Sequence, residues 1–173
     1  MISLKSLSKR YDLQAGFFAP VGRYVYAVNG ISLELRDNEI YGLVGESGCG
    51  KTTTARMIIR MEEPTDGEIQ YRDETEEFSV TSLKKEGLRR YRSRVKYIFQ
   101  DPARSLNPRM SIEDILLAGY RYSPYWPGKG QARQEAAEIM KEVGLSGDDL
   151  ERRPADFSGG QRQRISIARA LIQ

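Results

Sequence analysis

Residues 45–52, which read Gly-Glu-Ser-Gly-Cys-Gly-Lys-Thr, constrain the fold of this chain more than any other stretch. They fill every fixed position of the phosphate-binding loop, in which a glycine and four variable residues precede Gly-Lys-Ser/Thr. The apolar run at residues 40–44 predicts a strand that leads into the loop, and residues 53–60 predict the helix that leaves it. This context predicts that the chain binds a nucleoside triphosphate.

The residue types of the loop suit the binding of a polyphosphate. Glycines at positions 45, 48 and 50 let the backbone curl tightly enough for successive N–H groups to point at one anion. The N-terminus of the following helix adds positive potential at the same place. Lys51 is expected to place its charge between the β- and γ-phosphates, and the Thr52 hydroxyl to complete the coordination of Mg²⁺.

The composition narrows the class of protein. With 173 residues, the chain can hold one domain, or one domain and a small attachment. No run approaches the ~18 apolar residues that cross a membrane. Residues 1–9 alternate like a strand and lack the apolar core of a signal peptide. The 27 basic and 24 acidic residues form a mixed surface, which gives no argument for a nucleic-acid partner.

Two residue types limit the chemistry. The sequence has no histidine, which excludes histidine as a general base or metal ligand within these residues. The single cysteine, Cys49, excludes an internal disulfide and suits a reducing compartment. Because Cys49 occupies a variable position of the loop, we expect it to be a small filler rather than a catalytic group.

Alternating apolar residues predict several strands. Residues 1–9 show this alternation, and residues 24–36 resume it after a loop that contains glycine and proline. Shorter strands are expected at residues 68–72 and 95–99, and residues 73–78 are expected to be an exposed acidic segment. Antiparallel strands that precede a phosphate loop predict an α/β core with an added β-subdomain.

The remaining segments predict helices. Residues 83–94 form a basic helix candidate, whose six positive charges we interpret as a solvated face rather than a grip on phosphates. Ser111 is expected to cap the next helix, with Asp114 three residues on. An apolar stripe over residues 132–143 predicts a further helix, which Gly144 is expected to end.

A second glycine-rich motif, Phe-Ser-Gly-Gly-Gln at residues 157–161, precedes a helix with an apolar face at Ile165, Ala168 and Ile172. Ser158 is a natural N-cap, and the two glycines permit a close approach of another backbone or ligand. On its own, this motif could equally be a simple helix start. Because the motif follows a phosphate loop in the same chain, more than a hundred residues downstream, it also has a second interpretation.

Together the two motifs resemble the ATP-binding cassette (ABC) family, in which the second stretch is the signature motif. Gln100, at the end of the expected strand, resembles the glutamine loop of that family. Tyr11 lies where the family usually has an aromatic residue that stacks on adenine, and Tyr24 is the alternative. Within the family, several stretches resemble the peptide/nickel importer branch: the N-terminal loop at residues 12–23, residues 45–48, 99–102 and 105–110, Phe157 before the signature serine, and residues 162–165.

The resemblance implies a role for each motif. The expected ATP-binding residues are Tyr11, Gly45, Glu46, Ser47, Gly48, Cys49, Gly50, Lys51, Thr52, Thr53 and Gln100. Thr52 and Gln100 would touch Mg²⁺, and Gln100 would sense the γ-phosphate. Because two cassettes of this family sandwich two ATP molecules head to tail, the signature residues would contact the ATP held by the partner: Ser158, Gly159, Gly160 and Gln161.

The implied fold is a P-loop NTPase (RecA-like) α/β core with an antiparallel β-subdomain and a helical signature subdomain. Residues 1–100 would form the nucleotide-binding core, residues 101–157 the helical subdomain, and residues 158–173 the signature motif and its helix. A complete cassette continues into an apolar strand that ends in Asp-Glu (Walker B), a D-loop and a switch histidine. We therefore expect a fragment of a longer cassette, without a general-base glutamate and inactive in hydrolysis by itself.

The absent strand is also expected to affect folding, because in the family it lies beside the strand at residues 40–44. We predict that residues 1–173 alone are marginally stable, prone to associate, or rescued by the remaining segment of the cassette. The functional expectation is an ATP-binding subunit that works with Mg²⁺, a second cassette and membrane permease subunits at the cytoplasmic face of the cell membrane. A substrate-binding protein would be an indirect partner, and nucleic acid is not expected. Oligopeptides or dipeptides are the first expectation for the solute, with nickel and oligosaccharides as relatives.

Two other functions remain open at this point. An ATPase of DNA repair or chromosome maintenance shares both motifs, but it predicts a long coiled coil or a zinc insertion between Gln100 and the signature. The intervening segment is short and has neither heptads nor cysteines. A nucleotide-binding module without hydrolysis is the other alternative.

Overall fold

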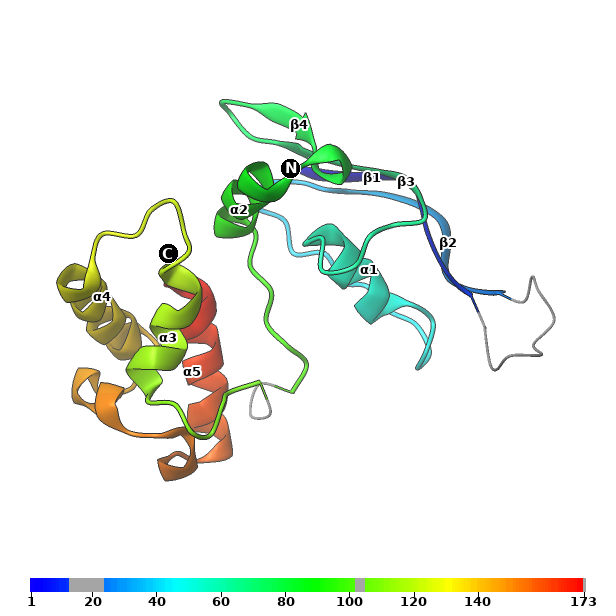
Figure 1. The fold of residues 1–173 in the computed structure, drawn as a ribbon. Coiled ribbons are helices and arrows are strands. Elements are labelled where there is room, and N and C mark those ends of the chain that lie inside the picture. The colour runs from blue at the N-terminus through cyan, green and yellow to red at the C-terminus, as the bar shows by residue number, and fades with distance from the viewer. Residues whose placement is uncertain (13–23, 102–104, 173) are drawn as a thin grey trace, which may run out of the picture. The chain divides into compact units, whose positions relative to one another are not determined.

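The computed structural model describes residues 1–12, 24–101 and 105–172, and these form two compact units, Met1–Leu88 and Arg89–Gln173. Figure 1 shows the helices and strands of each unit. Within the described residues, no helix combines the length and the apolar character needed to span a membrane.

The first unit is built on a four-stranded antiparallel sheet in the order β2-β1-β3-β4. Leu4 of β1 faces Leu33 of β2 on one side and Ile69 of β3 on the other. Helix α1 packs against one face of the sheet (Figure 1). The elements of this unit are β1 (Ile2–Asp12), β2 (Tyr24–Leu35), α1 (Lys51–Ile58), β3 (Asp66–Arg72), β4 (Glu77–Ser79) and the 3-10 turn η1 (Val80–Ser82).

An irregularity in β1 sets the core of this sheet. Leu4 and Leu7 are both buried, although they are three residues apart and would face opposite sides of a regular strand. The register shifts between them, and Ser6 has a positive φ of 47°. A bulge of this kind adds a residue and returns Leu7 to the core side. Opposite it, a Cβ on Gly67 would meet the Ser6 carbonyl oxygen at 2.4 Å, so this position requires glycine.

Residues 74–77 are exposed, as predicted, but the sequence did not predict the hairpin of β3 and β4. Residues 77 and 78 pair with β3, and the rings of Tyr71 and Phe78 stack at 5.1 Å. The Asp73 carboxylate closes the turn, because it accepts hydrogen bonds from the backbone N–H groups of Thr75 and Glu76. These bonds hold the pKa of Asp73 well below its usual range.

Two expected strands do not form, and the structure corrects these predictions. Residues 40–44 and 95–99 carry no strand pairing in the described part of the chain. Ile40 and Val44 are 101% and 92% exposed. An apolar sequence becomes a strand only when a neighbouring strand satisfies its N–H and C=O groups.

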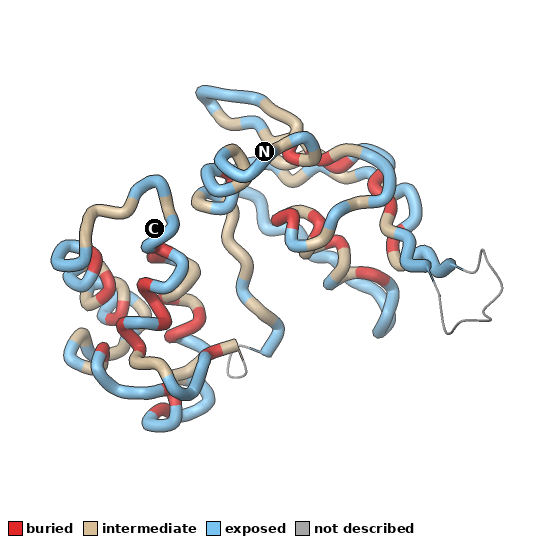
Figure 2. Tube along the Cα trace, viewed as in Figure 1, coloured by how far each residue is buried: buried red, intermediate tan, exposed pale blue. Residues whose placement is uncertain are grey.

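The second unit is a cluster of helices with one continuous core. Figure 2 shows the buried residues along the sides on which α3, α4 and α5 face each other. Ile112, Leu116, Met140 and Ile165 are among its fully buried side chains. The elements are the end of α2 (Lys85–Arg94), α3 (Ile112–Tyr120), α4 (Lys129–Glu142), α5 (Gly159–Leu171) and the 3-10 turns η2 (Gly147–Glu151) and η3 (Pro154–Asp156).

The helix boundaries confirm the capping predictions. The Ser111 hydroxyl accepts a hydrogen bond from the Asp114 N–H at 3.1 Å. Helix α4 ends in a Schellman motif, in which Gly144 (φ 73°) donates to Lys141 and Leu145 donates to Met140. The basic residues just before and within α2 are all exposed, and their interpretation as a solvated face stays a prediction: Lys84, Lys85, Arg89, Arg90, Arg92 and Arg94.

Candidate nucleotide-binding site

The phosphate loop leads directly into α1, which begins at Lys51, two residues earlier than expected. Gly48 and Gly50 have φ angles of 85° and 92°, in the region that favours glycine. Gly50 also lies against β2, because a Cβ there would meet the Ala27 carbonyl oxygen at 2.2 Å. The loop glycine is therefore required both by its backbone conformation and by its packing.

The N-terminus of α1 suits an anion. Its N-cap residue is glycine and supplies no side-chain hydrogen bond, and its first turn contains no acidic residue. The first N–H groups of a helix have no partner within the helix, and they carry the positive end of the helix dipole. A phosphate group at this position would accept hydrogen bonds from these N–H groups and would be stabilised by the positive end of the helix dipole.

Lys51 folds back over the loop. Its Nζ donates hydrogen bonds to the carbonyl oxygens of Gly45 at 2.7 Å and Glu46 at 2.6 Å, and lies 3.4 Å from the Cys49 sulfur. The ammonium group therefore lies inside the ring of the loop. A polyphosphate would offer it stronger, charged acceptors than these neutral carbonyl oxygens.

The other predicted loop residues lie at the surface. Glu46, Ser47, Cys49 and Thr52 are exposed, so the Thr52 hydroxyl is available to a metal-bound phosphate. Among the described residues, no cluster of acidic or cysteine side chains could hold a metal ion by itself. A Mg²⁺ ion here would need oxygen ligands from the nucleotide and water in addition to Thr52.

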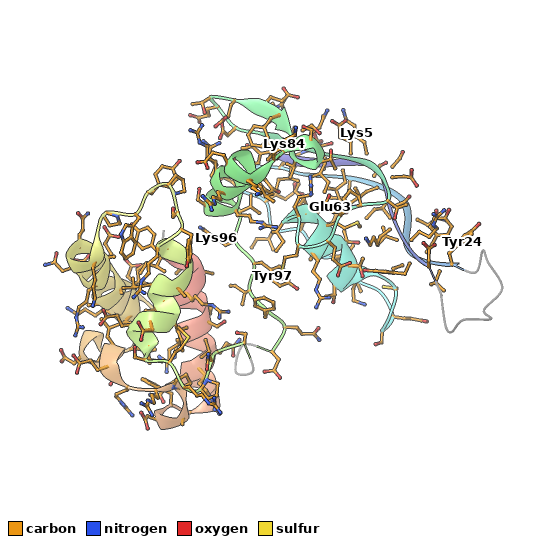
Figure 3. The ribbon with its side chains drawn as sticks, in the orientation of Figure 1. Lys5, Tyr24, Glu63, Lys84, Lys96 and Tyr97 are labelled. Atoms are coloured by element: carbon orange, nitrogen blue, oxygen red, sulfur yellow. The ribbon has the colours of Figure 1, made fainter. Side chains whose placement is uncertain are left out.

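Tyr11 lies on the same side of the first unit as α1. Its hydroxyl donates a hydrogen bond to Glu62 Oε2. This bond, together with partial burial, raises the pKa of Tyr11. Tyr24, the alternative, packs instead with Arg10 at 5.0 Å and edge-on with Tyr26 at 5.5 Å. Figure 3 shows Tyr24 at the outer end of β2.

The signature residues form the start of α5. Ser158 Oγ accepts from the Gln161 N–H, and the Gln161 side chain accepts from the Ser158 N–H at 2.8 Å, which completes a capping box. Among residues 1–12, 24–101 and 105–172, a Cβ on Gly159 or Gly160 would meet nothing within 4 Å. Packing within these described residues therefore does not require the two glycines, and the space beside them is open.

Gln100 is exposed and belongs to the second unit with the signature. The structure thus brings Tyr11 and the loop residues together in one unit, and it places Gln100 and residues 158–161 in the other. Lys9, Arg56 and Glu62, which surround Tyr11, were not predicted as site residues from the sequence. No local pattern marks them, because they come from three separate segments.

The fold and the loop define a P-loop nucleotide-binding cassette. The family model described as ABC transporter matches residues 28–173, and the chain belongs to this family. This confirms the resemblance and the fold class that the sequence predicted.

Curated relatives point to one branch of the family. The chain is 45% identical over 159 residues to the oligopeptide transport ATP-binding protein OppF of Bacillus subtilis, covering 92% of this chain and 51% of the relative. It is also 45% identical over 147 residues to the dipeptide transport ATP-binding protein DppF of Lactococcus lactis, covering 84% and 46%. The chain thus spans about half the length of the curated relatives it matches.

A solved structure supports the assignment to the ABC family. The ATP-binding cassette MJ0796, in a dimeric post-hydrolysis state bound to ADP and Pi, matches with a TM-score of 0.77 and 28% identity. The match covers 99% of this chain and 69% of the other.

Proposed function

We propose that this chain is the ATP-binding part of an ABC importer subunit that serves the uptake of oligopeptides or dipeptides. The observation that carries the proposal is the phosphate loop, in which Lys51 lies within the ring and α1 begins without a side-chain cap. The names of the relatives OppF and DppF support peptides as the solute class.

The proposed roles follow from the chemistry of each group. Residues 45–53 hold the triphosphate through backbone N–H groups, Lys51 neutralises charge on the β- and γ-phosphates, and the Thr52 hydroxyl contacts Mg²⁺. Tyr11 stacks on adenine. Gln100 contacts the Mg²⁺ ion and senses the γ-phosphate when the cassette is complete.

The proposed partners use the second unit. The open space beside Gly159 and Gly160 supports an approach by the ATP of a second cassette, to which Ser158 and Gln161 would also contribute. The helical unit would dock a membrane permease, and the subunit would lie at the cytoplasmic face of the membrane. A substrate-binding protein would act on it only through the permease.

We further propose that residues 1–173 bind Mg-ATP without hydrolysing it unaided. Their sequence contains no histidine and no apolar run that ends in Asp-Glu. Phosphoryl transfer depends mainly on charges that stabilise the transferring phosphoryl group and on groups that orient the attacking water.

The test is calorimetric titration of the purified chain with Mg-ATP, together with an assay of phosphate release. The wild type should bind, and Lys51→Ala should weaken binding by a few kcal/mol because it removes a charged contact. Lys84→Ala is the matched control, because Lys84 is an exposed lysine in the basic segment at residues 83–94, outside the phosphate loop. This variant should bind Mg-ATP like the wild type. Turnover that depends on Lys51 would contradict the non-hydrolytic proposal, and unchanged affinity in Lys51→Ala would contradict the binding site.

A further inference from the structure

Tyr11 is held at its hydroxyl by a chain of charged side chains. The hydroxyl donates to Glu62 Oε2, and the other oxygen of the same carboxylate accepts from Arg56 Nη1 at 3.2 Å. Arg56 belongs to the last turn of α1, whereas Tyr11 belongs to β1. Glu62 therefore ties the tyrosine of the sheet to the helix that starts at the phosphate loop.

The ring of Tyr11 is fixed at a second point. Lys9, two residues earlier and on the same side of β1, places its Nζ 5.1 Å from the centroid of the ring. The same Nζ donates to the Glu63 carbonyl oxygen at 2.7 Å, which anchors the lysine. Tyr11 nevertheless stays 40% exposed. Its orientation is thus determined while part of the ring remains accessible.

The position of this ring relates it to the phosphate loop. The phenol is linked through Glu62 to Arg56 in the last turn of α1, and Lys51 is the first residue of the same helix. A helix rises ~1.5 Å per residue, so the eight residues of α1 extend over about 12 Å between the phosphate loop and this link. A ligand that is held by the loop through its phosphates could reach the ring with a flat, apolar end.

We infer that Glu62 is a positioning residue, which holds Tyr11 ready to stack on the base of a purine nucleotide, with Lys9 as the second support. This inference rests on the proposed function. A flexible tyrosine loses rotamer freedom when it stacks, and that loss weakens binding. Lys9 and Glu62 order the ring before the nucleotide arrives, so that most of this entropy is already lost in the free protein.

The experiment compares two ligands on the 173-residue chain by calorimetric titration in Mg²⁺: ATP, and inorganic triphosphate, which has no base. Tyr11→Leu should weaken ATP about tenfold, because stacking on a base is lost. Glu62→Ala and Tyr11→Phe should each weaken ATP by a smaller factor, and the double variant should bind like the weaker of the two. Glu62→Gln keeps an acceptor for the hydroxyl and should restore part of the affinity.

Inorganic triphosphate should bind equally to the wild type and to all these variants, which also shows that each variant is folded. The matched control is Glu63→Ala, because Glu63 is the adjacent carboxylate but pairs with Arg60, and its side chain is 69% exposed against 21% for Glu62. It should leave both affinities unchanged. If Glu62→Ala matched the wild type for ATP while Tyr11→Leu did not, Glu62 would not be a positioning residue.

Two other results would overturn the inference at different levels. If Tyr11→Leu bound ATP like the wild type, the base would not stack on Tyr11, although the phosphate site would stand. If the wild type bound neither ATP nor triphosphate, the proposed function would fail, and the role of Glu62 with it.

Discussion

The Arg169 guanidinium, in the helix that follows the signature, donates hydrogen bonds to both the carbonyl oxygen of Ser105 at 2.8 Å and its hydroxyl at 3.0 Å. The same group lies 5.8 Å from the centroid of the Phe99 ring, next to Gln100. Burial lowers the pKa of Arg169. Arg169 therefore connects the signature helix α5 to Phe99 and Ser105, which precede and follow Gln100 in the sequence.

Arg169→Gln should destabilise the second unit by about 1–3 kcal/mol, because it leaves Ser105 without its charged donor in a partly buried place. Arg169→Lys keeps the charge but not the planar fork, and should restore only part of the loss. The measurement is urea unfolding followed by circular dichroism. Arg164→Gln is the control on the same helix, since Arg164 donates to the Gly144 carbonyl oxygen at 2.9 Å from an exposed position. An equal loss in both variants would contradict a special role for the Ser105 contact.

The features that the sequence predicted well depend on short stretches of chain. The caps at Ser111 and Ser158 and the positive φ of Gly144 follow from residue types within one helical turn. The phosphate loop is a continuous eight-residue pattern whose glycines have a steric reason to be there. Such signals do not require knowledge of the rest of the fold.

The features that were missed depend on distant residues. Residues 40–44 have the composition of a strand, but pairing requires a neighbour that composition cannot supply. The bond between Tyr11 and Glu62 joins residues that are 51 positions apart, and either side chain could equally have been solvated. The hairpin strand β4 was hidden because its acidic neighbours suggested an exposed loop.

Gly50→Ala should destabilise the first unit and remove nucleotide binding. An alanine at this position would have to adopt the left-handed backbone conformation of Gly50 (φ 92°). Its Cβ would also approach the Ala27 carbonyl oxygen to 2.2 Å. Gly48→Ala is the matched control, because it has a similar φ of 85° but nothing within 4 Å of the added Cβ. Backbone strain alone should cost about 1–2 kcal/mol in the control, and Gly50→Ala should cost clearly more. Thermal unfolding measures the difference, and equal melting temperatures would show that the contact with Ala27 is easily relieved.

Ser158→Ala should cost about 1 kcal/mol of stability, the usual loss for an N-cap hydroxyl. Ser111→Ala removes the same kind of cap from α3 and should cost a similar amount. Urea unfolding of the two variants tests this equality. If Ser158→Ala is nearly neutral while Ser111→Ala is not, the Ser158 hydroxyl does not stabilise α5 in the free protein, and the capping box described here is wrong.

Tyr120 should make the free energy of unfolding of the second unit decrease as the pH rises in the alkaline range. Burial, followed by the hydrogen bond to Glu135 Oε2 at 2.7 Å, raises the pKa of Tyr120 to about 12. The usual tyrosine value is about 10, so the folded state holds this proton more tightly than the unfolded state does. The stabilisation is fully present below pH ~10 and is lost as the pH rises through about 12.

Tyr120→Phe should remove this contribution while it keeps the edge-on ring contact with Trp126 at 5.4 Å. Free energies of unfolding measured by urea at several pH values between ~9 and ~12 should therefore fall more steeply for the wild type than for the variant. The comparison of two slopes is needed because lysines also titrate in this range. Tyr122→Phe, an exposed tyrosine two residues away, should follow the wild-type slope. Parallel curves for wild type and Tyr120→Phe would show that the proton of Tyr120 is held no more tightly in the folded chain than in the unfolded one.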